Sequence, residues 1–178
     1  MDFNPKADSS LRQLIESCLR GEQRAWTQLV SKYERLIYSV AHALCPEPED
    51  CADVFQRVCL ALYQNLDRLR SDQIIPAWLT TVTRRQAYKV IRSRGSYTQI
   101  GEHEVAVEAS VERIREEFEV QLAIDCMDQR CQRLIRLLYF DSNEPSYAEI
   151  AAELGMPVAS VGPTRARCLE KLKKLLKS

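Results

Sequence analysis

A tight turn near the C-terminus is followed by residues whose types and spacing suit contact with duplex DNA. Ser146 and Glu149 stand three positions apart, so each side chain can bond the backbone N–H of the other and start a helix. Gly155 supplies the left-handed residue that ends this helix. A recognition helix enters the major groove by its first turns, where arginine pairs with guanine and threonine contacts a thymine methyl or a phosphate. The residues predicted for this role are the helix cap Ser160 and the side chains of Thr164, Arg165, Arg167 and Lys171.

The same hairpin also has a plainer interpretation. Paired surface helices are common, and the lysines that follow Arg167 could merely solvate the second helix. We favour DNA contact because the capping box, the glycine turn and the positions of the arginines agree with one another. The second helix is predicted from a cap at Ser160 to about Leu176, which places Pro163 in a first turn where a missing N–H breaks no helical bond.

A second group of cations lies between Arg84 and Arg94, a stretch with five basic residues and no acid. Tyr88 interrupts this basic stretch, and Trp78 precedes it. Cations that follow phosphates and rings that stack on bases are the composition that holds single-stranded nucleic acid. The alternative is a solvated basic face with both rings in or beside the core. From the residues alone, we expect Trp78 in the core and the arginines on nucleic acid.

The charge is unevenly distributed, although 25 basic and 25 acidic residues give no net charge. Seven glutamates and only two arginines lie between Glu102 and Glu119, whereas six basic residues and one acid lie between Arg165 and Lys177. Two positive elements joined by an acidic connector suggest two contacts with a polyanion. We expect the connector either to avoid the polyanion or to cover the basic faces in its absence.

The cysteines and histidines show no pattern typical of catalysis. The seven cysteines are an odd number without a Cys-x-x-Cys spacing, so we expect reduced thiols in the core. His42, Cys45 and Cys51 could ligate a metal, but ordinary packing is favoured. No nucleophile–base or phosphate-loop motif occurs, which predicts a protein that is not an enzyme and needs no metal or cofactor. The lack of a long apolar run or a leader predicts no membrane insertion and a cytoplasmic location.

The apolar residues recur at helical spacing and the chain has only five glycines, which predicts an all-α fold of two small helical domains. The domains are predicted over residues 1–94 and 111–178, with a flexible linker over 95–110. In the first domain, helices are expected over residues 11–20, over a longer segment that ends at Cys45, over 49–66 and over a segment that starts at Pro76. In the second domain, helices are expected over 111–127 and 129–140, followed by the two helices of the hairpin.

Four groups of residues, in this order, resemble motifs of the bacterial sigma factors of the extracytoplasmic-function class, group four of the sigma-70 family. The resemblance covers nearly the whole chain, with three motifs in conserved region 2 and one in region 4. It implies a protein that binds core RNA polymerase, brings it to promoters, helps to open the duplex and is monomeric when free. The motifs are Gly21-Glu22 with Ala25-Trp26, Asp53-Val54-Phe55-Gln56-Arg57-Val58, Ala77-Trp78-Leu79 with Thr83-Arg84, and Ser146-Tyr147 through Gly162-Pro163-Thr164-Arg165-Ala166-Arg167.

The resemblance also implies which residues make each contact. The β′ clamp helices of the polymerase would bind Asp53, Gln56 and Arg57. The hairpin would read the −35 duplex through the five residues given above and would touch the β flap. The family often has an anti-sigma partner, and masking by the acidic connector is the alternative. The melted −10 strand would meet Arg68, Arg70, Ser71, Trp78, Arg84, Arg85, Tyr88, Lys89 and Arg92.

Two rival functions stay open. A sigma-like decoy would bind an anti-sigma protein and never touch a promoter, although the retained cations at 84–94 and 165–177 argue against it. A stand-alone helix-turn-helix regulator would leave Asp53 and Gln56 as idle surface residues.

Overall fold

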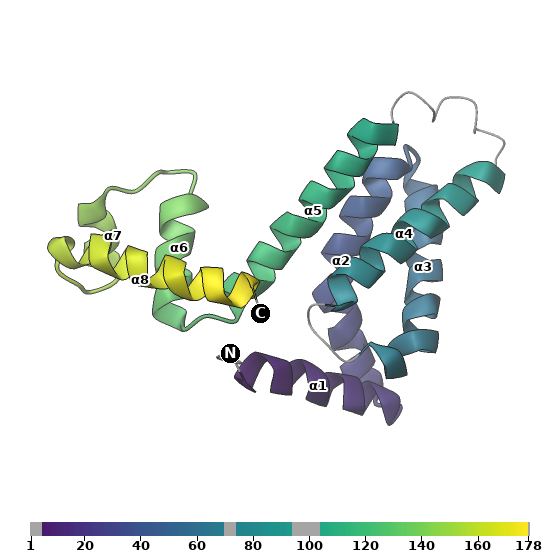
Figure 1. Ribbon diagram of the computed structural model, residues 1–178, viewed down its shortest axis with the longest axis horizontal. Coiled ribbons are helices and arrows are strands. Elements are labelled where there is room, and N and C mark those ends of the chain that lie inside the picture. The colour runs from purple at the N-terminus through teal and green to yellow at the C-terminus, as the bar shows by residue number, and fades with distance from the viewer. Residues whose placement is uncertain (1–4, 70–73, 94–103, 178) are drawn as a thin grey trace. The chain divides into compact units, whose positions relative to one another are not determined.

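Every element in the described part of the chain is a helix, which confirms the predicted all-α class (Figure 1). The computed structural model describes residues 5–69, 74–93 and 104–177, with side chains from residue 11 in the first helix and from residue 108 in the fifth. The chain divides into an N-terminal unit, Pro5–Phe118, and a C-terminal unit that includes residues 119–177. No helix among the described residues has the length and apolarity to cross a membrane. The elements are α1 (Pro5–Leu19), α2 (Gln23–Leu44), α3 (Pro48–Asn65), the short 3-10 helix η1 (Leu66–Arg68), α4 (Ile74–Ser93), α5 (Glu104–Asp125), α6 (Gln129–Tyr139), α7 (Tyr147–Glu153) and α8 (Val158–Leu176).

Helices α1 to α4 build the core of the N-terminal unit. Buried residues recur along α2 at three- and four-residue spacing from Ala25 to Ala41, which is the period of one helical face. Pro48 opens α3, where the missing N–H has no intrahelical partner to lose. Glu49 and Asp50 follow in the first turn and suit the positive end of the helix dipole. The fully buried side chains of this unit include Ile15, Leu29, Tyr33, Leu36, Ile37, Leu62, Ile75 and Leu79.

Two threonines on the inner face of α4 differ in how their hydroxyl groups are bonded. Thr80 is 8% exposed, and its Oγ1 donates to the carbonyl oxygen of Pro76 at 2.9 Å. Thr83 is fully buried, and its Oγ1 has no hydrogen-bond partner among the described residues. A buried hydroxyl without a partner costs about 1–3 kcal/mol of stability.

The acidic connector is helical along much of its length. Helix α5 begins at Glu104, so the predicted linker to residue 110 and the predicted helix start at Val111 are wrong for this segment. Glutamate and alanine are strong helix formers, but the segment lacks the apolar period on which the prediction relied. Val111 is buried, and the ring of Phe118 lies 5.9 Å from that of Tyr33 between centroids. This part of α5 therefore packs within the N-terminal unit, while the functional domains 1–94 and 111–178 stay a prediction.

Helices α6 to α8 share one apolar core with the last turns of α5. The predicted capping box of α7 is confirmed, because Glu149 Oε2 accepts from Ser146 N at 2.7 Å and Ser146 Oγ accepts from Glu149 N at 3.4 Å. Gly155 has a φ of +58°, the left-handed conformation expected just after α7. The local sequence therefore fixes where the hairpin turns. The core includes Ile124, Leu134, Ile135, Ile150, Ala151, Val161 and Leu172.

Helix α8 begins ahead of its predicted cap. Pro157 takes the N-cap position, so Ser160 lies inside the first turn and does not cap the helix. Pro163 consequently lies within the helix and not in its first turn. Its missing N–H leaves the carbonyl of Ala159 without the usual bond from four residues on. Because Ala159 is exposed, water can bond this carbonyl instead.

The prediction that all cysteines are reduced core thiols is wrong for one pair. Cys131 of α6 and Cys168 of α8 form a disulfide, with their Cα atoms 5.4 Å apart. Their sequence separation of 37 residues shows no motif, and only the packing of α6 on α8 brings them together. Burial raises the pKa of the other thiols for which a shift is resolved, so these stay protonated at neutral pH. These thiols belong to Cys18, Cys51 and Cys59.

Candidate nucleic-acid interface

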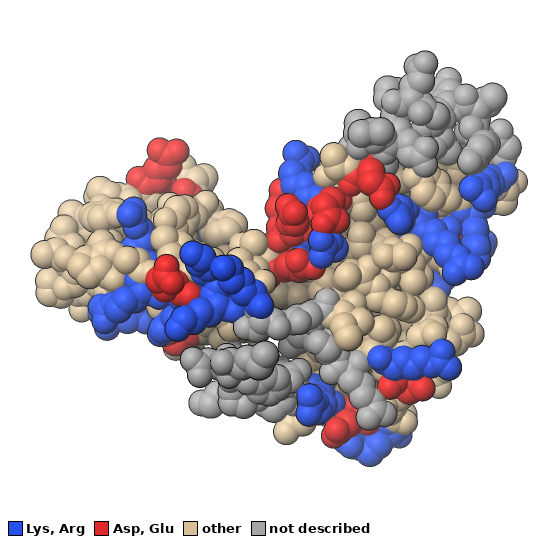
Figure 2. Space-filling model, viewed as in Figure 1, with Lys and Arg blue, Asp and Glu red and all other residues tan. Residues whose placement is uncertain are grey.

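The outer face of α4 carries the cations predicted for the −10 strand. Arg85 and Lys89 are exposed four positions apart, and Arg92 is exposed one turn later. Tyr88 is half-buried between them, on the same side of the helix. Figure 2 shows basic side chains gathered over the C-terminal end of α4. A ring held among cations can stack on an unpaired base while the cations meet its phosphates.

Trp78 lies on this same face and not in the core. It is half-buried, and it precedes Arg85 by seven residues, which is two helical turns. The expectation from the residues alone, a core tryptophan, is therefore wrong. Its predicted role at the −10 strand stays a prediction.

One cation of this face is already paired. Arg84 Nη1 forms an ion pair and hydrogen bond with Glu108 Oε1, and the two side chains are 36% and 52% exposed. Glu108 comes from the acidic stretch predicted as the linker, and in the structure it lies on α5. A residue of the connector thus touches the predicted −10 surface within the N-terminal unit.

The loop before α4 is described only in part. Arg68 is exposed in η1, and Leu69 is buried beside it, so the start of the loop is anchored in the core. Arg70 and Ser71 lie outside the described residues, and their predicted roles at the −10 strand stay predictions.

Four of the five residues predicted for the −35 duplex share one face of α8. Ser160, Thr164, Arg167 and Lys171 follow one another at four- and three-residue spacing, which aligns them along the helix. The helix buries Val161, Cys168 and Leu172 on an adjoining face. The aligned residues therefore lie beside the buried face, on the side of α8 that is open to solvent. Arg167 bonds within this set, because its Nη2 lies 3.3 Å from Thr164 Oγ1.

Arg165 stands apart from the other four residues, on the opposite flank of the buried stripe. Its Nη1 donates to the hydroxyl oxygen of Tyr147 at 2.9 Å. Tyr147 is the first residue of α7 and is 39% exposed. The tyrosine therefore holds the arginine across the turn of the hairpin. Sequence reasoning missed this role, although Tyr147 directly follows the capping serine.

Lys171 links α8 to the start of α6. Its Nζ lies 2.8 Å from Asp128 Oδ2, and Asp128 Oδ1 accepts from the backbone N–H of Cys131 at 3.0 Å. The ammonium and this N–H hold the pKa of the Asp128 carboxyl below its ordinary value. Lys171 is therefore a structural contact as well as a predicted phosphate contact.

The outer face of α3 combines the predicted polymerase contacts with exposed apolar side chains. Arg57 Nη2 lies 2.9 Å from Asp53 Oδ2, and this pairing raises the pKa of Arg57. Gln56 is exposed next to the pair. Leu60 and Tyr63 continue the same side of the helix and are 58% and 67% exposed. The Tyr63 ring also packs edge-on against the ring of Trp26 at 5.6 Å between centroids, so apolar side chains adjoin the predicted polymerase contacts. The sequence offered a signal, since Leu60 and Tyr63 fall off the buried stripe of α3.

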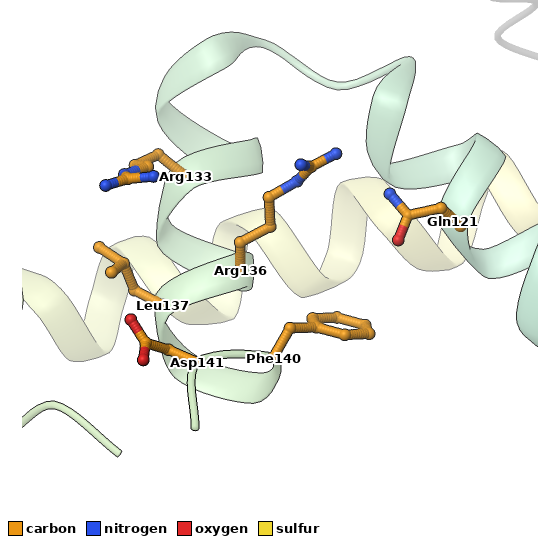
Figure 3. Close-up of a pocket in the computed structure, with 6 residues that line it drawn as sticks. All are labelled: Gln121, Arg133, Arg136, Leu137, Phe140 and Asp141. Carbon is orange, nitrogen blue, oxygen red and sulfur yellow. The ribbon is translucent and has the colours of Figure 1, made fainter. Parts of the chain in front are cut away.

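A shallow cavity of about 260 Å³ lies in the C-terminal unit (Figure 3). Its two arginines are neutralised, because Arg133 pairs with Glu153 at 2.5 Å and Arg136 with Asp125 at 2.6 Å. The cavity therefore offers no uncompensated arginine among these residues. Its lining consists of Gln121, Arg133, Arg136, Leu137, Phe140 and Asp141.

The histidine and cysteine group of the N-terminal unit makes a pairwise contact. His42 Nδ1 lies 3.3 Å from Cys51 Sγ, and that Sγ lies 3.6 Å from the carbonyl oxygen of Cys45. Within residues 5–69, 74–93 and 104–177, no cluster of three His, Cys, Asp or Glu side chains is placed to hold a metal ion.

Comparison with known proteins places α3, α4 and most of α2 in a known domain. Residues 29–97 match the family description of sigma-70 region 2. The RNA polymerase sigma-H factor of Pseudomonas aeruginosa is 26% identical over 181 residues, which cover 93% of each chain. The ECF RNA polymerase sigma factor SigW of Bacillus subtilis is 23% identical over 94% of this chain and 97% of its own.

A solved structure, CnrH in complex with the cytosolic domain of CnrY, aligns with 96% of this chain and 97% of its own at 24% identity and a TM-score of 0.40. Residues 29–97 thus match a sigma-70 region 2 domain, and nearly the whole chain is similar to two RNA polymerase sigma factors, one of which is named as an ECF factor.

Proposed function

We propose that this chain binds core RNA polymerase, directs it to specific promoters and helps to open their −10 region. The observation that carries the proposal is the presence of two cationic helical faces on separate units. One is interleaved with aromatic rings on α4 and the other lies along α8 of a helix-turn-helix. The first suits a single strand and the second suits the major groove of a duplex.

At the −10 element, the α4 face acts by binding and needs no catalytic residue. Unstacking a base costs a few kcal/mol, and a ring that receives the extruded base offsets that cost. Tyr88 and Trp78 are half-buried and therefore held in place, while Arg85 and Lys89 stay exposed for phosphates. Binding of the single strand then shifts the equilibrium between closed and open duplex toward the open form.

At the −35 element, the aligned face of α8 contacts the duplex. Thr164 and Arg167 lie in the first half of the helix, where a recognition helix meets base edges. Lys171 lies further along and contacts a phosphate. Arg165, held by Tyr147, reaches the backbone on the other side of the helix.

Polymerase binding is assigned to α3. Asp53 and Gln56 supply polar contacts to the β′ clamp helices, and Leu60 and Tyr63 supply the apolar area. The C-terminal unit touches the β flap. These partners place the chain in the cytoplasm, where the polymerase works. It is monomeric when free, and an anti-sigma protein is an expected regulator by analogy with the family.

The proposal is tested by run-off transcription with core polymerase and genomic fragments, followed by mapping of start sites. We expect discrete start sites that require the chain, and about tenfold weaker core binding for D53A. Transcripts that do not depend on the chain would refute the proposal. Tight binding to an anti-sigma domain without any transcript would establish the decoy. Promoter binding that D53A leaves unchanged would instead indicate a stand-alone regulator.

A further inference from the structure

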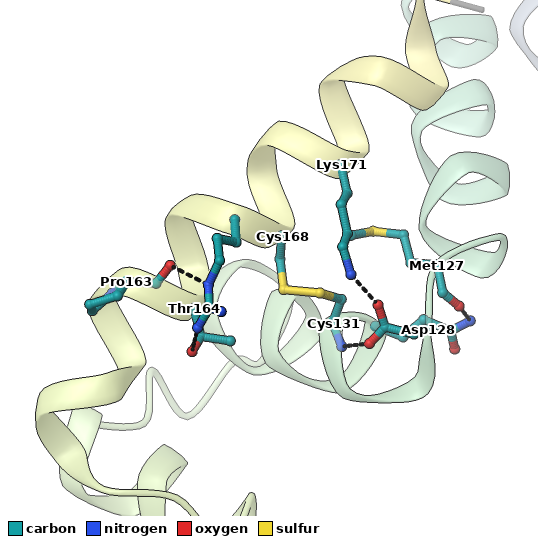
Figure 4. Close-up of a disulfide and its surroundings, with 9 residues drawn as sticks. Met127, Asp128, Cys131, Pro163, Thr164, Cys168 and Lys171 are labelled. Carbon is teal, nitrogen blue, oxygen red and sulfur yellow. Dashed lines mark hydrogen bonds and ion pairs between the residues drawn. A yellow bond between two sulfur atoms is a disulfide. The ribbon is translucent and has the colours of Figure 1, made fainter. Parts of the chain in front are cut away.

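The disulfide joins α8 to α6 on the buried side of α8, next to the face that carries Thr164, Arg167 and Lys171 (Figure 4). Cys168 is fully buried, follows Arg167 and comes one turn after Thr164. Cys131 is 5% exposed and lies in the first turn of α6. The bond therefore fastens the helix that carries the predicted DNA contacts to a helix that carries none of them.

An ion pair joins the same two helices close to the disulfide. Asp128 caps α6 through the N–H of Cys131, and its second carboxylate oxygen meets Lys171 at 2.8 Å (Figure 4). Lys171 lies one turn beyond Cys168 on α8. The two helices thus have two links, and of these only the disulfide depends on redox conditions.

We propose that Cys131 and Cys168 form a reversible redox site that sets how firmly α8 is held against α6, and thereby the affinity of the C-terminal unit for duplex DNA. The inference rests on the proposed function, because a protein that works with cytoplasmic RNA polymerase meets thiol reductants. Disulfides in that compartment are usually transient and redox-sensing. The bond closes a loop that contains α7 and the first half of α8, and breaking it returns conformational freedom to that loop.

The reaction needs a small oxidant that can reach a nearly buried sulfur, and hydrogen peroxide meets this requirement. Cys131 is the more exposed of the two residues, and its thiolate attacks one oxygen of the peroxide. The O–O bond breaks, and Cys131 becomes a sulfenic acid. The second peroxide oxygen takes up a proton and leaves as water. The Cys168 sulfur then attacks the sulfenic sulfur, the S–S bond forms and a second water leaves. The two cysteines lose two electrons and two protons, and the peroxide is reduced. A cellular dithiol reverses the change by exchange and is itself oxidised to a disulfide.

The chain is treated either with hydrogen peroxide or with dithiothreitol. Each form is then titrated against a short fluorescent DNA duplex. The duplex comes from a promoter that the chain activates, or it has a random sequence and is used at low salt. We expect the reduced form to bind about three- to tenfold more weakly, and renewed oxidation to restore binding. Peptide mapping should find the Cys131–Cys168 linkage in the oxidised form alone. The C131S variant should bind equally in both conditions, whereas C126S, which changes a half-buried cysteine outside the disulfide, should keep the response.

Thermal unfolding of the wild-type chain separates this inference from the proposed function. A reversible linkage with a higher Tm in the oxidised form supports the redox site even if C131S folds poorly. Oxidised protein without the linkage, or equal duplex binding in both forms, would overturn it. A chain that forms the linkage reversibly but supports no transcript would refute the sigma-factor function and leave the redox site standing.

Discussion

Glu108 on α5 forms an ion pair with Arg84 on α4, so a residue of the acidic connector already occupies one cation of the predicted −10 surface. The contact does not stand alone, because Val111 is buried one turn further along and Phe118 packs on Tyr33. These apolar contacts hold the acidic helix against the N-terminal unit. If Arg84 binds the −10 strand as predicted, that strand must displace Glu108.

The E108Q variant should bind single-stranded −10 DNA more tightly by about two- to fivefold, the range expected for a partly exposed ion pair. The measurement is fluorescence anisotropy with a single-stranded promoter oligonucleotide. E116Q removes an equal charge from the same helix and is the matched control. Equal affinities for the two variants would show that Glu108 acts only through net charge.

Removal of Arg167 should weaken duplex binding by about 1–3 kcal/mol and lower the salt slope by about one. Y147F leaves Arg165 charged and removes only the hydroxyl that holds it, so its effect should be smaller than that of R167A. Binding isotherms at several salt concentrations check both variants. If Y147F proved as harmful as R167A, the tyrosine and not the aligned face of α8 would dominate recognition.

The exposed apolar residues of α3 should matter for the polymerase and not for DNA. L60A and Y63A are each expected to weaken binding to core polymerase about tenfold, because truncation of an apolar anchor at an interface costs about 1–2 kcal/mol. L19A removes another exposed leucine, at the end of α1, and should have no effect. Core binding measured by surface plasmon resonance decides the matter, and unchanged binding of all three variants would place the interface elsewhere.

Replacement of Thr83 by valine should stabilise the N-terminal unit by about 1 kcal/mol, because it removes a buried hydroxyl that lacks a partner and keeps the side-chain shape. T80V removes a hydroxyl that donates to Pro76 and should not stabilise. Urea unfolding followed by circular dichroism provides the comparison. A stabilisation of equal size in both variants would mean that the gain comes from apolarity alone.

The helices were predictable where a local signal marks their ends, as at Ser146 and Gly155. The start of α5 at Glu104 was missed, because its helical tendency comes from glutamate and alanine and its packing depends on Tyr33, a residue far away in sequence. The first turn of α8 was misplaced because a serine is a stronger cap signal than Pro157. Tertiary contacts supplied what the local patterns lacked.

The residues of the candidate surfaces were largely predictable, since charge and aromatic type already indicate nucleic acid. The residues with which they interact inside the chain were not predictable. The bonds from Arg84 to Glu108, from Arg165 to Tyr147 and from Cys131 to Cys168 each join segments that no short motif connects. Half-burial of Trp78 likewise depends on which side of α4 meets the core.

Pro163, inside α8, bears on how selective this protein can be. It follows Gly162, and the two together leave a thin stretch of helix with little side-chain volume on the turn beside Thr164. The peptide backbone can approach a groove closely there, yet it presents few groups that tell one base pair from another. We therefore expect upstream elements that vary widely among the promoters served, with discrimination falling mainly on the nucleotides exposed by melting.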